Sequence, residues 1–411
     1  MEKLATSQGE RLHIALFGRR NAGKSSLINA LTNQDTALVS NVPGTTTDPV
    51  YKNMELLPLG PVVMIDTAGI DDVGMLGELR VQRSMKVMNK TDLGLLVLDL
   101  EIGLGEYERD LLKNMCQREI PVIGVINKID RHSNAEIKKK EWERELGIPV
   151  VLTSAITREG IDDLKQAIIK NTSHDWLKSV IIGDLIDPGD GVVLVIPIDT
   201  GAPKGRLILP QVQTIRDIID HDGFAIMVKE RELKEALQNL KKPPRLVVTD
   251  SQAFMKAGAD TPLEIPLTSF SILFARYKGD LVTMVEGAKA ISKLKSGSKI
   301  LIAEACTHHQ QADDLGKVQI PRWIRQLVGG DIDFEWVHGG DFPSDLQKYQ
   351  LIIHCGACMI NRKEMIYRAN QAKEEGVPIV NYGVLLAYIH GILDRALEPF
   401  PLAKLVWEEE E

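Results

Sequence analysis

The 411 residues of this chain are enough for about two or three domains, and 44% of them are hydrophobic, so each domain can bury a core. The 49 lysines and arginines are outnumbered by 57 aspartates and glutamates, and the resulting net charge of −8 argues against a nucleic-acid or membrane partner. No apolar run reaches the ~18 residues of a spanning helix and four unevenly spaced cysteines form no disulfide framework, so we expect a cytoplasmic protein.

The first predicted element is a buried strand at residues 13–17. It leads directly into Gly18-Arg19-Arg20-Asn21-Ala22-Gly23-Lys24-Ser25, and a helical pattern begins at Ser26. This strand–loop–helix setting is typical of a phosphate-binding loop. Its glycines let backbone N–H groups surround the phosphates, Lys24 can neutralise the β- and γ-oxygens, and the Ser25 hydroxyl can bind Mg²⁺. We therefore assign nucleotide contacts to Gly18, Asn21, Ala22, Gly23, Lys24, Ser25 and Ser26.

Two further segments follow in the order that a GTPase requires. Thr46, in the polar segment 44–48, offers a hydroxyl to Mg²⁺ and the γ-phosphate. A strand at 62–65 then ends in Asp66-Thr67-Ala68-Gly69, where Asp66 would lie in the second shell of Mg²⁺ and the Gly69 N–H would sense the γ-phosphate. We expect catalysis to depend on Lys24, Thr46, Asp66 and Gly69.

A guanine site is predicted at the end of the strand 122–126. The sequence Asn127-Lys128-Ile129-Asp130 follows that strand, and the Asp130 carboxylate can accept two hydrogen bonds that guanine offers and adenine does not. Ser154 and Ala155, after a strand at 150–152, complete the base pocket. The ordered set predicts a P-loop GTPase domain over residues 1–175, with a mostly parallel sheet, that binds GTP or GDP with Mg²⁺.

These motifs resemble the branch of translation-factor-related GTPases that contains the tRNA-modification GTPase MnmE and the ribosome-assembly GTPase Era. Asn21 is similar to the asparagine that accompanies a K⁺ ion in that branch, although a side chain here can also simply stabilise the loop. Ile70 stands where Ras-like proteins carry a water-orienting glutamine. The resemblance implies slow unaided hydrolysis that K⁺ and dimerisation accelerate. Cys116, in a helix before residue 120, is expected to be a core or half-buried thiol without a role.

Residues 176–265 alternate between strand and helix patterns and show no motif with chemistry. The clearest helix is predicted over 209–220, with Ile208, Val212, Ile215, Ile218 and Ile219 on one apolar face. By elimination we expect residues 176–265 to form a dimerisation or coupling domain. Residues 266–411 are expected to form a third α/β domain, and both are smaller than the first.

The third domain carries three of the four cysteines. Cys306 follows a strand at 299–303, and His354-Cys355-Gly356-Ala357-Cys358 follows a strand at 351–353. A further strand is predicted at 377–381, and parallel strands would bring these segments to one edge of a sheet. Thiolates gathered with imidazoles indicate a metal site. The residues leave two metals open: a zinc ion on three Cys and one His, or an iron–sulfur cluster whose fourth iron binds a histidine or an outside ligand.

The joint pattern of Cys306-x-His308 and His354-Cys355-x-x-Cys358 behind such a GTPase resembles the FeFe-hydrogenase maturation GTPase family HydF. The resemblance implies a 4Fe–4S cluster on Cys306, Cys355 and Cys358, with His308 and His354 as candidates for an exchangeable fourth position. It also implies a homodimeric or larger scaffold that receives a transient di-iron subcluster from the radical-SAM maturases HydE and HydG. The scaffold would deliver it to the hydrogenase catalytic subunit. The alternative is a regulatory or RNA-modification GTPase with structural zinc.

Overall fold

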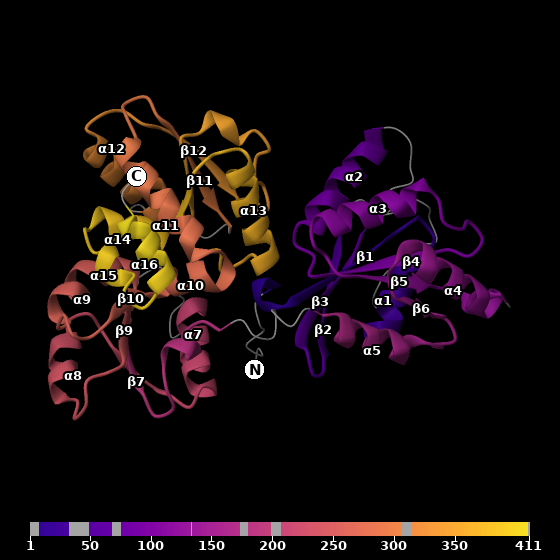
Figure 1. Ribbon diagram of the computed structural model, residues 1–411, viewed down its shortest axis with the longest axis horizontal. Coiled ribbons are helices and arrows are strands. Elements are labelled where there is room, and N and C mark those ends of the chain that lie inside the picture. The colour runs from indigo at the N-terminus through magenta and orange to yellow at the C-terminus, as the bar shows by residue number, and fades with distance from the viewer. Residues whose placement is uncertain are drawn as a thin grey trace. The chain divides into compact units, whose positions relative to one another are not determined.

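The computed structural model divides into two compact units, Met1–Lys178 and Ser179–Glu411 (Figure 1). None of the helices in the described part of the chain has the length and apolar character needed to cross a bilayer. The structure describes residues 8–32, 49–67, 75–132, 134–172, 180–198, 207–305 and 314–409.

The first unit is built on a six-stranded sheet in the order β2-β3-β1-β4-β5-β6. Among the described strands of this sheet, β2 alone pairs antiparallel to its neighbour, and the other pairs are parallel. The predicted mostly parallel GTPase sheet is therefore confirmed. Its strands are β1 (Leu12–Gly18), β2 (Val50–Leu56), β3 (Gly60–Asp66), β4 (Leu93–Leu98), β5 (Val122–Ile126) and β6 (Val150–Leu152).

Helices cover both faces of this sheet (Figure 1). Successive strand residues point to opposite faces, so Ile14 and Leu16 of β1 join one core while Ala15 and Phe17 join the other. The first core is closed by α1 (Lys24–Thr32) and α5 (Ile161–Asn171). The second is closed by α2 (Met75–Met88), α3 (Glu106–Gln117) and α4 (Ala135–Leu146).

Cys116 corrects one expectation about this unit. It lies near the end of α3 and its side chain is exposed, so the expected core or half-buried thiol is wrong. The buried positions of α3 are Glu108, Leu111 and Met115, and the cysteine falls outside that stripe.

The second unit begins with a four-stranded parallel sheet in the order β10-β9-β7-β8. The predicted helix 209–220 is confirmed as α7, but its buried residues are Gln211, Thr214 and Ile218, whereas Val212 and Ile219 are exposed. The elements are β7 (Gly191–Val195), α7 (Leu209–Asp220), β8 (Phe224–Val228), α8 (Leu233–Asn239), β9 (Leu246–Thr249), α9 (Phe254–Asp260) and β10 (Leu267–Ser269).

A second parallel sheet follows in the order β12-β11-β13-β14. The expected parallel arrangement of the three predicted strands is confirmed, and β12 adds a strand that the sequence did not predict. The strands are β11 (Lys299–Glu304), β12 (Asp333–His338), β13 (Leu351–His354) and β14 (Ile379–Asn381). The helices of this part are α10 (Phe270–Lys278), α11 (Leu281–Lys289), α12 (Ile320–Val328), α13 (Arg362–Glu374), α14 (Tyr382–Ile389), α15 (Leu393–Ala396) and α16 (Pro401–Glu408).

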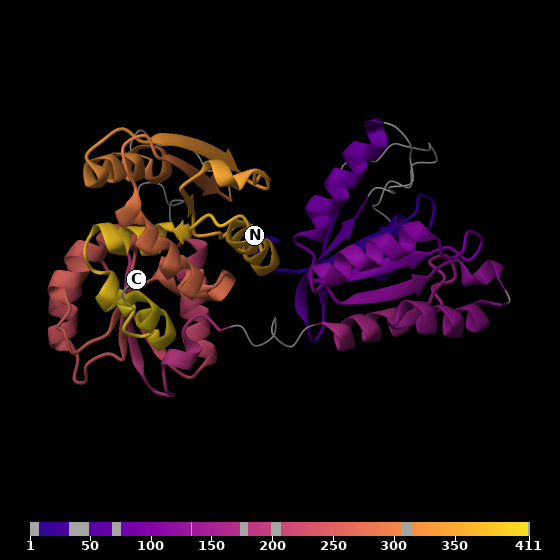
Figure 2. The ribbon, with the colours of Figure 1, turned by 45° about the horizontal axis from the view of Figure 1, so that its top comes forward.

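One continuous core joins the two sheets of the second unit. It contains Leu194 of β7, Ile302 of β11 and Phe274 of α10. Figures 1 and 2 show α10, α11 and α14 in the layer between the two sheets. Helix α10 therefore packs between the two sheets, and its last residue, Lys278, reaches the segment that follows the cysteines.

Candidate functional sites: a phosphate loop and a cysteine loop

The phosphate loop between β1 and α1 depends on two glycines with positive φ. Gly18 has φ +147°, and a Cβ there would lie 2.4 Å from the Val97 carbonyl oxygen. Gly23 has φ +91°, and its Cβ would lie 2.3 Å from the side-chain nitrogen of Asn127. No other residue type fits either position without displacing its neighbour. The loop can adopt this shape because Gly18 and Gly23 have no side chains, and its backbone N–H groups can then approach an anion.

Lys24 and Ser25 lie at the start of α1 in the positions that the motif predicts. The buried Lys24 ammonium donates to the carbonyl oxygens of Gly18 at 2.9 Å and Arg19 at 2.7 Å. The Ser25 hydroxyl donates to the Asp66 carboxylate, which joins the expected Mg²⁺ ligand to its expected second-shell partner. Burial raises the pKa of Asp66, and the Ser25 hydrogen bond and the Lys24 charge oppose that rise.

Two predicted residues of this site are not placed. Thr46 and Gly69 lie outside the described residues, as does Ile70. Ser26 is described and follows Ser25 in α1, and Asn21 adopts a left-handed conformation with φ +61° in the loop.

The predicted base pocket is assembled around Asn127. Its amide nitrogen donates to the Ala22 carbonyl oxygen at 3.2 Å, and its amide oxygen accepts from the Ala155 N–H at 3.2 Å. One side chain thus ties the phosphate loop to the base loop. Asp130 accepts a hydrogen bond from the Ser154 hydroxyl at 2.6 Å, so one carboxylate oxygen is held in place.

Lys128 lies in the same loop in a left-handed conformation with φ +64° and pairs with Asp99 at 3.0 Å. Burial alone would raise the pKa of Asp99, but hydrogen bonds from Lys128 and from the Glu101 N–H outweigh it and lower the pKa. Asp99 therefore stays ionised and fixes the lysine stem.

The sequence did not predict the contacts that hold Arg19 of the phosphate loop. The Arg19 guanidinium donates to Glu108 of α3 at 2.7 Å and lies 5.1 Å from the centre of the Tyr107 ring. Glu108 is buried and also accepts the Gly105 N–H at 2.9 Å, which closes the N-terminus of α3. The one signal in the sequence is a glutamate three residues after Gly105, the spacing of a capping box.

The cysteine loop lies at the carboxyl edge of the second sheet. Strand β13 ends at His354, whose partner in β11 is Ala303, and the loop Cys355–Cys358 follows. The Ala305 N–H donates to the Cys355 sulfur at 3.1 Å. Ala305 immediately precedes Cys306, so the chain enters the Cys306 segment in contact with Cys355. Figure 1 shows β11 and β12 side by side in this sheet, as their pairing requires.

The donor set fits a metal–thiolate centre as far as the structure describes it. Cys355 and Cys358 are partly buried, and Ala357 between them has a positive φ of +54°. Cys306 and His308 lie outside the described residues. Within the described ranges no group of three or more Cys, His, Asp or Glu side chains is arranged to hold a metal ion. The two described thiols are of the ligand type that iron–sulfur and zinc sites use.

The surroundings of Cys355 hold its proton in the absence of metal. Burial raises the pKa of its thiol to about 11, although backbone N–H groups of Ala305 and Ala357 favour the thiolate. The buried Glu304 adds negative charge nearby and accepts a hydrogen bond from the Tyr382 hydroxyl at 3.1 Å. A metal ion that binds here must therefore displace a proton from the thiol.

His354 is fully buried with both ring nitrogens engaged. Its Nδ1–H donates to the Cys355 carbonyl oxygen at 2.9 Å, and its Nε2 accepts from the Arg368 guanidinium at 3.1 Å. Burial and the Arg368 charge lower the pKa of His354 to about 3, so the ring is neutral. Ligation of a metal by His354 would require one of these two hydrogen bonds to break.

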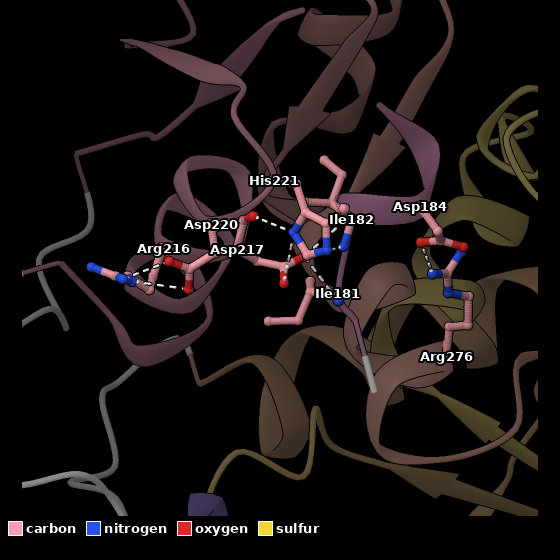
Figure 3. A network of polar contacts seen from close by, with 9 residues as sticks. Ile181, Ile182, Asp184, Arg216, Asp217, Asp220, His221 and Arg276 are labelled. Carbon is pink, nitrogen blue, oxygen red and sulfur yellow. Dashed lines mark hydrogen bonds and ion pairs between the residues drawn. The ribbon is translucent and has the colours of Figure 1, made fainter. Parts of the chain in front are cut away.

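A third polar cluster fastens the start of the second unit to α7 (Figure 3). One oxygen of Asp217 accepts the backbone N–H groups of Ile181, Ile182 and Gly183 at 3.0, 2.7 and 2.8 Å. Asp184, the next residue, forms an ion pair with Arg276 of α10 (Figure 3). No sequence motif predicts these contacts, because they join residues that are tens of positions apart in the chain.

Family models match three consecutive parts of the chain. Residues 13–128 match the 50S ribosome-binding GTPase model, 181–279 the hydrogen maturase F dimerization domain, and 282–399 the hydrogen maturase F tetramerization domain. The two maturase models together cover more than half of the sequence. The chain belongs to the hydrogen maturase F (HydF) family. The resemblance inferred from the GTPase and cysteine motifs is thereby confirmed, and the first unit of this HydF-family protein is a P-loop GTPase domain.

Curated relatives are similar over part of the chain. The tRNA modification GTPase MnmE of Moorella thermoacetica is 39% identical over 165 residues, which are 39% of this chain and 34% of that protein. MnmE of Nostoc sp. is 36% identical over 242 residues, 58% of this chain and 49% of that protein. The HydF-family chain thus spans a third to a half of these relatives. Among solved structures, the G domain of the FeoB iron transporter of T. maritima is 29% identical and covers 40% of this chain and 99% of that chain, with a TM-score of 0.32.

Proposed function

We propose that this HydF-family protein is a hydrogenase-maturation GTPase that carries a 4Fe–4S cluster and assembles or delivers the di-iron subcluster of an FeFe-hydrogenase. The observation that carries the proposal is the hydrogen bond from Ala305, the residue before Cys306, to Cys355, in a family named for hydrogen maturation. A GTPase domain on the same chain supports a nucleotide-dependent scaffold rather than a plain metal carrier.

Cys306, Cys355 and Cys358 would hold the cluster. The bound cluster supplies one iron position that no cysteine occupies, where another ligand can exchange. His308 and His354 are the candidates for that position, and His354 would have to give up its bond to Cys355 or to Arg368. The residues around the loop would bind and orient the thiolates and keep water from Cys355.

The nucleotide site and the cysteines belong to different units of the chain. Asp130 would recognise guanine, Lys24 and Ser25 would bind phosphates and Mg²⁺, and Thr46 and Gly69 would respond to the γ-phosphate. A K⁺ ion beside Asn21 would speed hydrolysis. GTP would thereby change which partner the protein meets, through its switch segments, and would not take part in cluster chemistry.

The partners would be HydE and HydG as sources of the di-iron subcluster, and the hydrogenase catalytic subunit as its recipient. The two maturase domain models support a homo-oligomer. We place the GTPase domain at 1–175, a dimerisation domain at 176–265 and a cluster domain at 266–411, although the dimerization model extends to residue 279. The cytoplasm is the expected compartment, because thiols stay reduced there.

Metal analysis of the anaerobically purified chain tests this proposal. We expect about four irons and four sulfides per chain, as a single 4Fe–4S cluster requires. One zinc per chain without sulfide would contradict the proposal and favour the regulatory or RNA-modification GTPase with a structural zinc site.

A further inference from the structure

Lys278 is a buried lysine whose ammonium points into the cysteine loop. It is the last residue of α10 and its exposed fraction is only 2%. The ammonium donates to the carbonyl oxygen of Ile360 at 2.8 Å and lies 3.5 Å from that of Cys358. It thus holds the backbone of the loop at one of the two described cysteines, across 80 positions of sequence.

A buried lysine ammonium loses solvation that an apolar side chain of similar length would not lose. Lys278 nevertheless places a positive charge in the interior, at the backbone of the loop that carries Cys358. A second fully buried cation, Arg368, contacts the other end of the segment through His354. Arg368 is already paired with Glu364 at 2.6 Å, whereas the Lys278 ammonium lies at the backbone of Cys358 itself. A cluster bound by thiolates is anionic and would be stabilised by the Lys278 charge.

Helix α10 is itself fastened at its C-terminal end. Arg276 forms an ion pair with Asp184, the residue that follows the three N–H groups held by Asp217 (Figure 3). Arg362, at the start of α13, donates to the Tyr277 carbonyl oxygen. Lys278 thus has a fixed position before any metal binds. It belongs to the segment 181–279 that matches the dimerization model, whereas the cysteine loop belongs to the segment 282–399.

We infer that Lys278 is a positioning residue of the metal site, which fixes the Cys358–Ile360 backbone and places a positive charge beside the thiolates from a helix of the dimerization segment. This inference rests on the proposed cluster function. A positive charge next to a cluster favours its reduced form, which carries one more negative charge. Loss of the charge should lower the reduction potential, and loss of the backbone contact should let the cluster escape sooner.

The test compares Lys278→Met with the full-length chain after anaerobic reconstitution with iron and sulfide. We expect Lys278→Met to lose iron to a chelator about tenfold faster and to have a lower midpoint potential in an EPR-monitored titration. Lys278→Arg, which keeps the charge, should restore the potential in part. Lys256→Met removes an exposed lysine of the same segment and should match the wild type in both measurements.

Three outcomes are decisive. A Lys278→Met chain with wild-type potential and chelator resistance would overturn the inference while leaving the proposed function intact. A wild-type chain without a 4Fe–4S cluster would overturn both. If Lys278→Met fails to fold by circular dichroism, Lys278→Gln keeps a hydrogen-bond donor and removes only the charge. A wild-type potential in that variant would also overturn the inference.

Discussion

The nucleotide site and the proposed metal site at the cysteine loop differ in the part of the polypeptide that would do the binding. The phosphate loop presents main-chain groups, and its shape depends on Gly18 and Gly23, which have no side chains to interfere. The cysteine site presents side chains, and its loop is held by the buried cations Lys278 and Arg368. A main-chain site is therefore sensitive to added atoms, whereas a side-chain site is sensitive to lost ligands and lost charges.

The largest expected effect is the complete loss of cluster binding in cysteine variants that keep GTP hydrolysis. Cys355→Ser and Cys358→Ser should each abolish cluster binding, because a hydroxyl does not replace a thiolate on iron. GTP hydrolysis by the same variants should stay within about twofold of the wild type, because the two sites lie in different units. Iron content and phosphate release measure the two outcomes. Cys116→Ser, an exposed position, is the matched control and should change neither. A folded cysteine variant that lost GTP hydrolysis would show that the sites are not separable.

The second prediction adds atoms to the main-chain site. Gly23→Ala should weaken GTP binding about 10- to 100-fold, because its Cβ would meet the Asn127 amide at 2.3 Å in a backbone conformation that alanine adopts poorly. A fluorescent GTP analogue gives the dissociation constant. Gly103→Ala is the control, since Gly103 also has a positive φ of +81° but its Cβ would enter open space. Equal weakening in both variants would mean that strain, and not the contact with Asn127, limits the site.

The third prediction removes a buried charge beside the cysteine loop. Arg368→Met should lower the free energy of unfolding of the second unit by about 3 kcal/mol, because it leaves His354 without its partner and Glu364 without its buried ion pair. Chemical denaturation of the apo protein measures this change. Arg216→Met removes an exposed ion pair with Asp220 and should have no measurable effect. An Arg368→Met variant as stable as the wild type would contradict the assigned role.

The smallest expected effect concerns the support of the phosphate loop. Glu108→Gln should weaken nucleotide binding about threefold to tenfold, because Arg19 loses a charge-assisted hydrogen bond but the loop keeps its glycines. The matched control is Glu145→Gln, which removes the carboxylate of an exposed pair with Arg109. If the two variants bind GTP equally well, the Arg19–Glu108 pair contributes nothing to the site.

The described parts of the nucleotide site could be recognised in the sequence, because the motifs at Lys24, Asp66 and Asn127 are short and each lies at the end of a buried strand. The sequence predicted α7 over the observed residues but only part of its buried face: Ile218 is buried and Ile215 packs against the core, whereas Val212 and Ile219 are exposed. The buried stripe follows Gln211, Thr214 and Ile218, and Gln211 is buried because its side chain accepts the Ile208 N–H. Hydrophobicity alone does not reveal a polar residue that is buried to cap a helix.

The cysteine site was predicted as a set of ligands and not as an environment. Cys355 and Cys358 follow a strand, which is visible in the sequence. The roles of Lys278 and Arg368 are not visible in the sequence, because their contacts come from the packing of α10 and α13 against the loop. Strand β12 was also missed, because only one of its residues is fully buried and the rest are partly or fully exposed. Such features depend on tertiary contacts that no local pattern encodes.

The proposed function requires that Cys306, Cys355 and Cys358 bind one iron–sulfur cluster together. The most direct measurement is the EPR spectrum of the anaerobically purified protein after reduction with dithionite, recorded for the wild type and for Cys306→Ser. We predict the signal of a reduced 4Fe–4S cluster in the wild type and its loss in the variant. A wild type without a signal, or a variant that keeps the wild-type spectrum, would contradict the account.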